Sequence, residues 1–292
     1  MSSNVAFLFP GQGRIPEALP SNSNQFSPLL ALANDAGLAL ETWIGSGDTD
    51  RLSQTDAAQP ILLFDSLCRA QCLRDVGWSP MCVAGHSLGE YAALVSAGVL
   101  TQADAMRAVI ERGHLMSHVQ GGAMAAILKL DLETVTALCD GTETVVANHN
   151  ALTQVIVSGP IASVKLVIQR AEDAGGRCIP LNVSGPFHSP LMQPAQDALS
   201  PLLQQLDFAE PRIPVISGVN GKAEDKATVL KDLLLRQITA SVRWVDVANE
   251  LERLDVDTAI EVGTGDVLTR LGLRSNSPIR FLTFEEAIHE RE

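Results

Sequence analysis

The sequence has no apolar run long enough to cross a bilayer, and its N-terminus has no basic segment followed by an apolar stretch and a cleavage site. It also has no C-x-x-C pair among its five cysteines. Cys68 and Cys72 lie four apart on an expected helix, where we interpret them as buried small hydrophobic side chains rather than metal ligands. We therefore expect a reduced, cytoplasmic protein that holds no metal and does not associate with membranes.

Positive charge is also scarce. The 21 Lys and Arg against 34 Asp and Glu give a net charge of −13, which would repel the phosphates of nucleic acid and excludes it as a partner class. Repeats and low-complexity tracts are absent, and the composition, with 46% hydrophobic and 19% charged residues, is that of a globular protein. A chain of 292 residues is long enough for one large domain or for a domain with an insertion.

Short apolar runs alternate with helical segments. The run "VAFLF" ends at Pro10-Gly11 and predicts a buried strand, and "PILLFDSLCRAQCLRDVG" predicts a helix with Pro60 in its first turn and Gly77 just after its end. Further along, "RIPVISGV", "DTAIEVG" and "RFLTF" predict strands, and a helix is expected around 226–238. This order indicates an α/β fold with a mostly parallel sheet.

Residues 122–183 have a different rhythm. Their expected elements follow the order β-α-β-β-α-β, which is the order of ferredoxin-like folds. We therefore expect a large α/β-hydrolase-like catalytic domain over 1–121 and 184–292, with an inserted ferredoxin-like subdomain at 122–183.

One serine lies in a G-x-S-x-G pattern within "AGHSLGEYAAL", residues 84–94. The strand "MCVAG" precedes Ser87 and the helix "SLGEYAALVSAGV" follows it at once, so Ser87 is expected on a strand-to-helix turn that exposes a nucleophile. Gly85 and Gly89 would allow the strand and the helix to pack closely there.

A serine nucleophile needs a base, and the chain has six histidines. His86 adjoins Ser87, and neighbouring side chains on a turn usually point apart. His188 lies in "NVSGPFHSPLM", at the end of an expected strand, where sites are commonly built. It is the best candidate, with a packing or capping histidine as the alternative. No aspartate between Ser87 and His188 occupies a convincing position to orient the base, which favours an activated substrate such as a thioester over an amide.

These residues resemble the malonyl-CoA:acyl-carrier-protein transacylases, together with the acyltransferase domains of polyketide and fatty-acid synthases. The resemblance covers nearly the whole chain. It rests on ordered motifs: "FPGQG" at 9–13, "GHSLGEYAAL" at 85–94, "ERG" at 111–113, "GPFHSPLM" at 185–192, "RQI" at 236–238 and "EVGTG" at 261–265.

The resemblance implies a role for each motif. Ser87 would be the nucleophile and His188 its base, with the backbone carbonyl of Gln237 as the group that orients the imidazole in place of a carboxylate. The oxyanion would be bound by the backbone N–H groups of Gln12 and Leu88.

Two further residues would recognise the acyl group. Helix periodicity alone places Arg112 at the edge of an apolar face and favours an arginine with its head in water. The resemblance implies instead that its guanidinium binds the free malonyl carboxylate, which a planar fork of donors suits. Phe187 resembles the malonyl-selective form of its loop, where a ring leaves little room for a methyl branch.

The implied reaction is a two-step transfer for fatty-acid or polyketide biosynthesis. Ser87 takes the malonyl group from coenzyme A, and the phosphopantetheine thiol of an acyl carrier protein then takes it from Ser87. Coenzyme A thioester is a substrate, no cofactor is needed, and we expect a monomer.

Several positions depart from the family pattern: Arg14, Ile15, Gly218, Thr264 and Asp266. They leave open a discrete acyltransferase of a polyketide assembly line, including one for another extender unit. A serine hydrolase or thioesterase would share the elbow at Ser87, but it would need a catalytic carboxylate and would have no need of Arg112. A carrier-binding protein with a silent serine would keep the fold without the activity.

The carrier protein raises a question of charge, because such carriers are typically acidic and so is this chain. We expect a local basic patch near the cleft between the subdomains, with Lys129, Lys165, Arg170 and Arg177 as candidates, against the alternative of ordinary surface charge.

Overall fold

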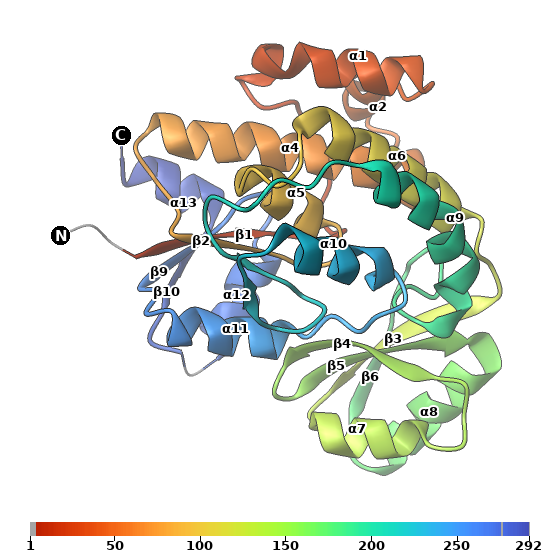
Figure 1. The fold of residues 1–292 in the computed structure, drawn as a ribbon. Coiled ribbons are helices and arrows are strands. Elements are labelled where there is room, and N and C mark those ends of the chain that lie inside the picture. The colour runs from red at the N-terminus through yellow and green to blue at the C-terminus, as the bar shows by residue number, and fades with distance from the viewer. Residues whose placement is uncertain (1–3, 276, 292) are drawn as a thin grey trace.

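The computed structural model describes residues 4–275 and 277–291. Two sheets organise the chain (Figure 1). The larger has six strands in the order β10-β9-β1-β2-β7-β8, all parallel except for the antiparallel β7–β8 pair. Its strands are β1 Val5–Phe9, β2 Cys82–Gly85, β7 Val215–Ile216, β8 Ala223–Glu224, β9 Thr258–Glu261 and β10 Arg280–Leu282.

Helices cover both faces of the large sheet, which explains why its strands are apolar without alternation. Along β1, Val5, Phe7 and Phe9 belong to one core with α4, α5 and α6, whereas Ala6 and Leu8 belong to a second core with α11 and α12. The helices are α1 Ser27–Asp35, α2 Leu40–Ser46, α3 Thr49–Ser53, α4 Thr55–Asp75, α5 Gly89–Ser96, α6 Gln102–Ser117, α9 Gln193–Gln205, α10 Ala227–Arg236, α11 Trp244–Arg253, α12 Val267–Leu273 and α13 Phe284–His289.

The second sheet has four antiparallel strands in the order β4-β5-β3-β6. Together with two helices it forms what we call the small unit: β3 Gly122–Leu128, α7 Leu132–Cys139, β4 Val145–Ala151, β5 Gln154–Pro160, α8 Ile161–Asp173 and β6 Arg177–Pro180. The expected β-α-β-β-α-β order and the α/β fold class are confirmed. The domain boundaries at 122 and 183 stay a prediction.

The central strands of the small sheet are covered on both faces. Ala125 and Ile127 of β3 pack under α7 and α8, while Met124 and Ala126 join the core of the larger part of the chain. Helices α7 and α8 therefore lie on the side of the small sheet that faces away from the large sheet (Figure 1).

The expected start of α4 is wrong. The helix begins at Thr55, five residues earlier, and Pro60 lies inside it. The proline removes only the bond to the carbonyl four residues before it, and burial of Ala57, Ala58 and Ile61 outweighs that loss. Gly77 follows the helix end as expected, with φ +91°.

Cys68 of α4 is buried and Cys72 is half-buried, both as free thiols. In the described part of the chain, no group of His, Cys, Asp and Glu is arranged to hold a metal ion. None of the helices within residues 4–275 and 277–291 has the length and apolar character that crossing a membrane requires.

Candidate active site

Ser87 lies on a sharp turn between β2 and α5. Its φ of +51° is unusual for a residue with a side chain, and it belongs to the nucleophile-elbow geometry. A Cβ at Gly85 would lie 2.2 Å from the backbone nitrogen of Glu90, and one at Gly89 would lie 2.0 Å from the Phe9 carbonyl oxygen. The expectation that both glycines permit close strand–helix packing is confirmed.

His188 is the histidine that meets this serine. Its Nε2 lies 2.8 Å from Ser87 Oγ, and its Nδ1 lies 2.9 Å from the Ala240 carbonyl oxygen and 3.2 Å from that of Gln237. Because carbonyls only accept hydrogen bonds, Nδ1 carries the proton and Nε2 presents its lone pair to the serine hydroxyl. The expected Gln237 carbonyl is present, but the Ala240 carbonyl is closer. No side-chain signal in the sequence could have revealed it.

Burial, and after it the charge of Arg112, lower the pKa of His188 from 6.5 to about 3. The imidazole is therefore neutral at physiological pH, which is the state that a general base requires. His86 does not compete for the serine. Its Nε2 lies 3.0 Å from Asn150 Oδ1, and its ring packs against Trp244.

Arg112 of α6 is 1% exposed, so the interpretation of a solvated surface arginine is wrong. Its guanidinium donates to Gln59 Oε1 at 2.6 Å, and to Ser87 Oγ and Gln237 Oε1 at 3.2 Å each. Burial lowers the pKa of the guanidinium. All three acceptors are neutral, so an incoming carboxylate could replace them with a stronger charge-assisted bond.

A buried carboxyl group, that of Glu90, lies behind Gln237. Glu90 accepts hydrogen bonds from Ser217 Oγ and Gln237 Nε2, both at 2.6 Å. Burial raises the pKa of Glu90, while these two donors oppose that shift. The Gln237 side chain thus joins Glu90 to Arg112, a role that the sequence could not reveal because nothing in "RQI" indicates it.

The two expected oxyanion donors follow residues that lie at the elbow, Leu88 after Ser87 and Gln12 after Gly11. A Cβ at Gly11 would lie 2.8 Å from the His86 carbonyl oxygen and 3.6 Å from Ser87 Cβ. This close approach brings the segment before Gln12 onto the elbow. No described residue accepts a hydrogen bond from the backbone N–H of Leu88 or Gln12.

Phe187 is 8% exposed and belongs to the main core. Its ring carbon Cε1 would lie 3.2 Å from a Cβ at Gly185. The ring is therefore fixed by packing immediately before the base.

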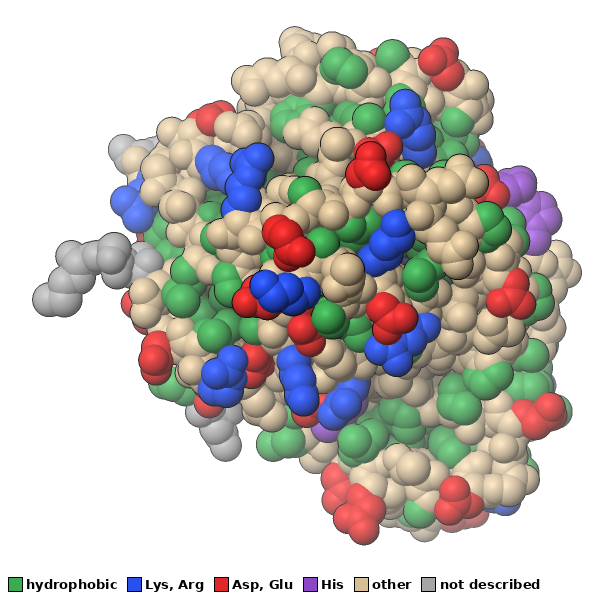
Figure 2. Space-filling model, in the orientation of Figure 1, with side chains coloured by type: hydrophobic (Ala, Val, Ile, Leu, Met, Phe, Trp, Pro, Cys, Tyr) green, Lys and Arg blue, Asp and Glu red, His purple; other side chains and the backbone are tan. Residues whose placement is uncertain are grey.

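The four candidate docking residues come from the sheet and from one helix of the small unit. Leu128 pairs with Arg177, so Lys129 and Arg177 share one end of the small sheet. Lys165 and Arg170 lie on α8, and Arg170 donates to the carbonyls of Leu138 and Asp140. Figure 2 shows acidic side chains gathered at the end of the molecule where α7 and α8 lie.

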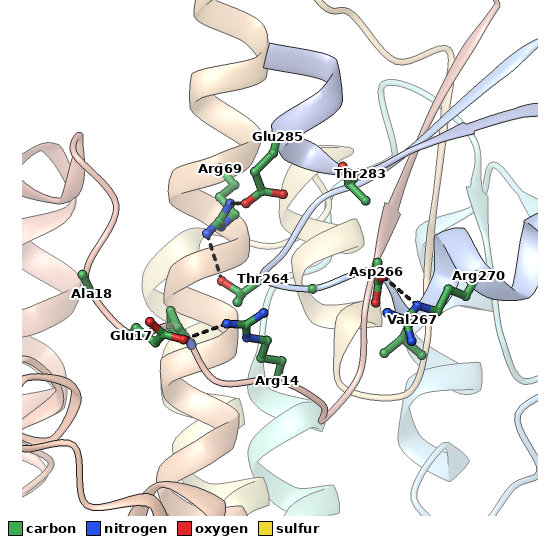
Figure 3. A pocket seen from close by; sticks show the side chains of 12 residues that line it. Arg14, Glu17, Ala18, Arg69, Thr264, Asp266, Val267, Arg270, Thr283 and Glu285 are labelled. Atoms are coloured by element: carbon green, nitrogen blue, oxygen red, sulfur yellow. Dashed lines mark hydrogen bonds and ion pairs between the residues drawn. The ribbon is translucent and has the colours of Figure 1, made fainter. Parts of the chain in front are cut away.

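Two cavities open near the segment that follows Gln12. One, of about 530 Å³, is lined by Gln12, by apolar side chains including Ile15, Ile44 and Leu52, and by Val183 next to the small unit. The other, of about 640 Å³, contains three departures from the family pattern, Arg14, Thr264 and Asp266. Figure 3 shows that the arginines in it face partners: Arg14 pairs with Glu17, Arg270 with Asp266, and Arg69 with Glu285 and Thr264.

The fold and this arrangement of side chains define an acyl transferase. The acyl transferase domain family matches residues 30–276. A malonyl CoA-acyl carrier protein transacylase from Bacillus subtilis (strain 168) is 36% identical over 97% of this chain and 94% of its own length. The chain belongs to the malonyl CoA-acyl carrier protein transacylase family.

Solved structures agree with this assignment. FabD from Acinetobacter baumannii is 33% identical and superimposes with a TM-score of 0.90, over 100% of this chain and 99% of that one. A malonyl-transacylase in complex with a type II PKS acyl-carrier protein is 31% identical, with a TM-score of 0.91, over 99% of this chain and 100% of that one.

Proposed function

We propose that the protein moves a malonyl group from coenzyme A to the phosphopantetheine thiol of an acyl carrier protein through a malonyl ester of Ser87. The observation that carries this proposal is the buried Arg112 guanidinium, 3.2 Å from Ser87 Oγ and bonded only to neutral acceptors. A closed site whose cation has no carboxylate bonded directly to it favours an acyl group that brings one.

In the first half-reaction, His188 Nε2 takes the Ser87 proton as Oγ attacks the thioester carbonyl. The backbone N–H groups of Leu88 and Gln12 stabilise the oxyanion. Collapse of the tetrahedral intermediate expels the coenzyme A thiolate, which takes the proton from the imidazolium. The second half-reaction reverses these steps: His188 accepts the proton of the carrier thiol, the thiolate attacks the malonyl-serine carbonyl, and Ser87 Oγ leaves with the proton returned by His188.

The Gln237 and Ala240 carbonyls support this role of His188 in place of a carboxylate. They orient the ring and accept from Nδ1–H while the imidazolium exists, but they bring no full counter-charge. A base of this strength suits a thioester, whose thiol leaves readily. No metal or redox group enters this scheme.

For the carrier, we propose that Lys129 and Arg177, at one end of the small sheet, contribute to docking.

Intact-protein mass spectrometry after brief exposure to malonyl-CoA, and separately to acetyl-CoA, tests the proposal. We expect a malonyl adduct on the wild type, little acetyl adduct, and neither on Ser87→Ala.

Arg112→Lys keeps the charge but loses the fork of donors, and we expect it to lower kcat/KM for malonyl loading by about 100-fold, or ~2.7 kcal/mol. Acetyl loading equal to malonyl loading would remove Arg112 as the selector. Release of free malonate without a carrier would favour a hydrolase instead.

A further inference from the structure

A continuous chain of side-chain hydrogen bonds leads from Arg112 to Gln12. Arg112 Nη1 donates to Gln59 Oε1 at 2.6 Å, Gln59 Nε2 donates to Thr55 Oγ1 at 2.8 Å, and Thr55 Oγ1 donates to Gln12 Oε1 at 2.8 Å. Gln12 Nε2 ends the chain on the Ser53 carbonyl, at 3.2 Å. Thr55 and Gln59 are 0% and 1% exposed, so water does not compete for the central links.

Arg112, the first member of the chain, determines which group donates in each of its hydrogen bonds. A guanidinium can only donate, so it turns the oxygen of the Gln59 amide toward itself and the NH₂ toward Thr55. The Thr55 oxygen then accepts, and its hydroxyl proton points to Gln12. The Gln12 amide is thereby held in one orientation. Links of one direction also polarise one another, which strengthens the chain.

The helices that carry this chain are in close contact. A Cβ at Gly113, the residue after Arg112, would lie 3.1 Å from Thr55 O and from Asp56 Cα. The start of α4 and the C-terminal part of α6 therefore cannot shift independently. Thr55 is the first residue of α4, and it reaches across to the segment that contains Gln12.

We propose that Thr55 and Gln59 are positioning residues that keep the main chain at Gln12 in register with Arg112. The inference rests on the proposed function. A malonyl thioester has its carboxylate and its reacting carbonyl separated by one methylene, so the groups that bind them must stand at one fixed separation. The hydrogen-bonded chain joins the carboxylate-binding residue directly to the segment that supplies an oxyanion N–H.

Single-turnover acylation of Ser87 by malonyl-CoA tests this link in four variants: Thr55→Val, Thr55→Ser, Gln12→Leu and the double variant Thr55→Val/Gln12→Leu. Valine has the shape of threonine without the hydroxyl, and leucine at 12 removes the amide but keeps the backbone N–H. Because loss of one oxyanion donor costs about 100- to 1,000-fold, we expect its partial misplacement in Thr55→Val to lower the saturating rate by about 10-fold. KM should stay within about 3-fold, since Arg112 keeps its own contacts.

The pattern across the variants separates a link from simple packing. Thr55→Ser should restore the rate, Gln12→Leu should equal Thr55→Val, and the double variant should be no slower than either single one. A product of the two effects, about 100-fold, would mean that the residues act independently and would overturn the inference. So would failure of serine to rescue.

The matched control is Thr136→Val, the same substitution on the exposed side of α7, which should leave the rate unchanged. If Thr55→Val does not fold, Gln12→Leu decides, because a wild-type rate in that variant would overturn the link. A wild type that forms no malonyl adduct defeats the proposed function itself. A normal adduct with a normal rate in Thr55→Val defeats only this inference.

Discussion

At the scale of single residues, the site depends on groups whose protonation is set by burial. The unfolded chain protonates His188 near pH 6.5, whereas the folded chain does so only near 3. Between these values the unfolded state binds more protons, so stability contributed by this group rises with pH and is lost as the pH falls through that window.

The same shift predicts the pH dependence of acylation. Because the base stays neutral below its ordinary pKa, we expect log kcat/KM for malonyl loading to stay level from pH 7 to about pH 5 instead of falling below 6.5. Rapid-quench measurement of the Ser87 adduct across this range is the check. Arg112→Ala, which removes a neighbouring positive charge, should raise the pKa that limits the acid side. An acid limb centred on 6.5 in the wild type would contradict the assignment of His188 as a buried, neutral base.

At the scale of elements, the turn at Ser87 depends on Gly85 and Gly89, which have no side chain and so let the backbone of neighbouring segments approach closely. Gly89→Ala would place a Cβ 2.0 Å from the Phe9 carbonyl oxygen, and neither β1 nor α5 has room to yield. We expect a loss of at least ~2 kcal/mol in the free energy of unfolding, measured by urea denaturation. Gly45→Ala in α2 is the control, since a Cβ there meets nothing within 4 Å and should be neutral or stabilising by up to ~1 kcal/mol. Equal stability of the two variants would show that the elbow tolerates displacement.

Elements and motifs differ in how far the sequence predicts them. The strands of the small unit, β1, and the turn at Ser87 follow from apolar runs bounded by glycine and proline, which are local signals. The early start of α4 and the short β7 do not, because packing against distant segments decides them. The partners of Arg112 are also beyond sequence reasoning: Gln59 and Gln237 are 53 and 125 positions away. Only the fold brings them together, and without that contact Arg112 resembles a surface residue.

At the scale of the whole molecule, polar contacts add to the shared apolar core in joining the small unit to the elbow and to the segment before α11. The Val242 backbone donates to Ala147 and accepts from His149, and His86 beside the nucleophile meets Asn150 of β4. Both half-reactions therefore depend on the position of the small unit relative to Ser87. The end with Lys129 and Arg177 lies about 20 Å along β3 from the end that touches Pro186, at ~3.3 Å per residue.

Charge reversal at that end tests carrier docking. We expect Lys129→Glu/Arg177→Glu to raise KM for the carrier by several fold, because acidic carriers would then meet like charge, with malonyl loading from coenzyme A unchanged. Stopped-flow or quench assays of the two half-reactions separate these effects. Arg274→Glu, an exposed reversal on the other part of the chain, serves as the control. Equal losses in both half-reactions would exclude docking at these residues.

The group that orients His188 is made of main-chain oxygens, and this has a genetic consequence. Every amino acid has a backbone carbonyl, so no single substitution at position 240 can delete this hydrogen-bond acceptor. A catalytic carboxylate, in contrast, would be lost through one substitution. Insertions or deletions between α10 and α11 would displace this oxygen. We therefore expect such enzymes to vary in the side chain at this position but to keep the length of the segment between α10 and α11.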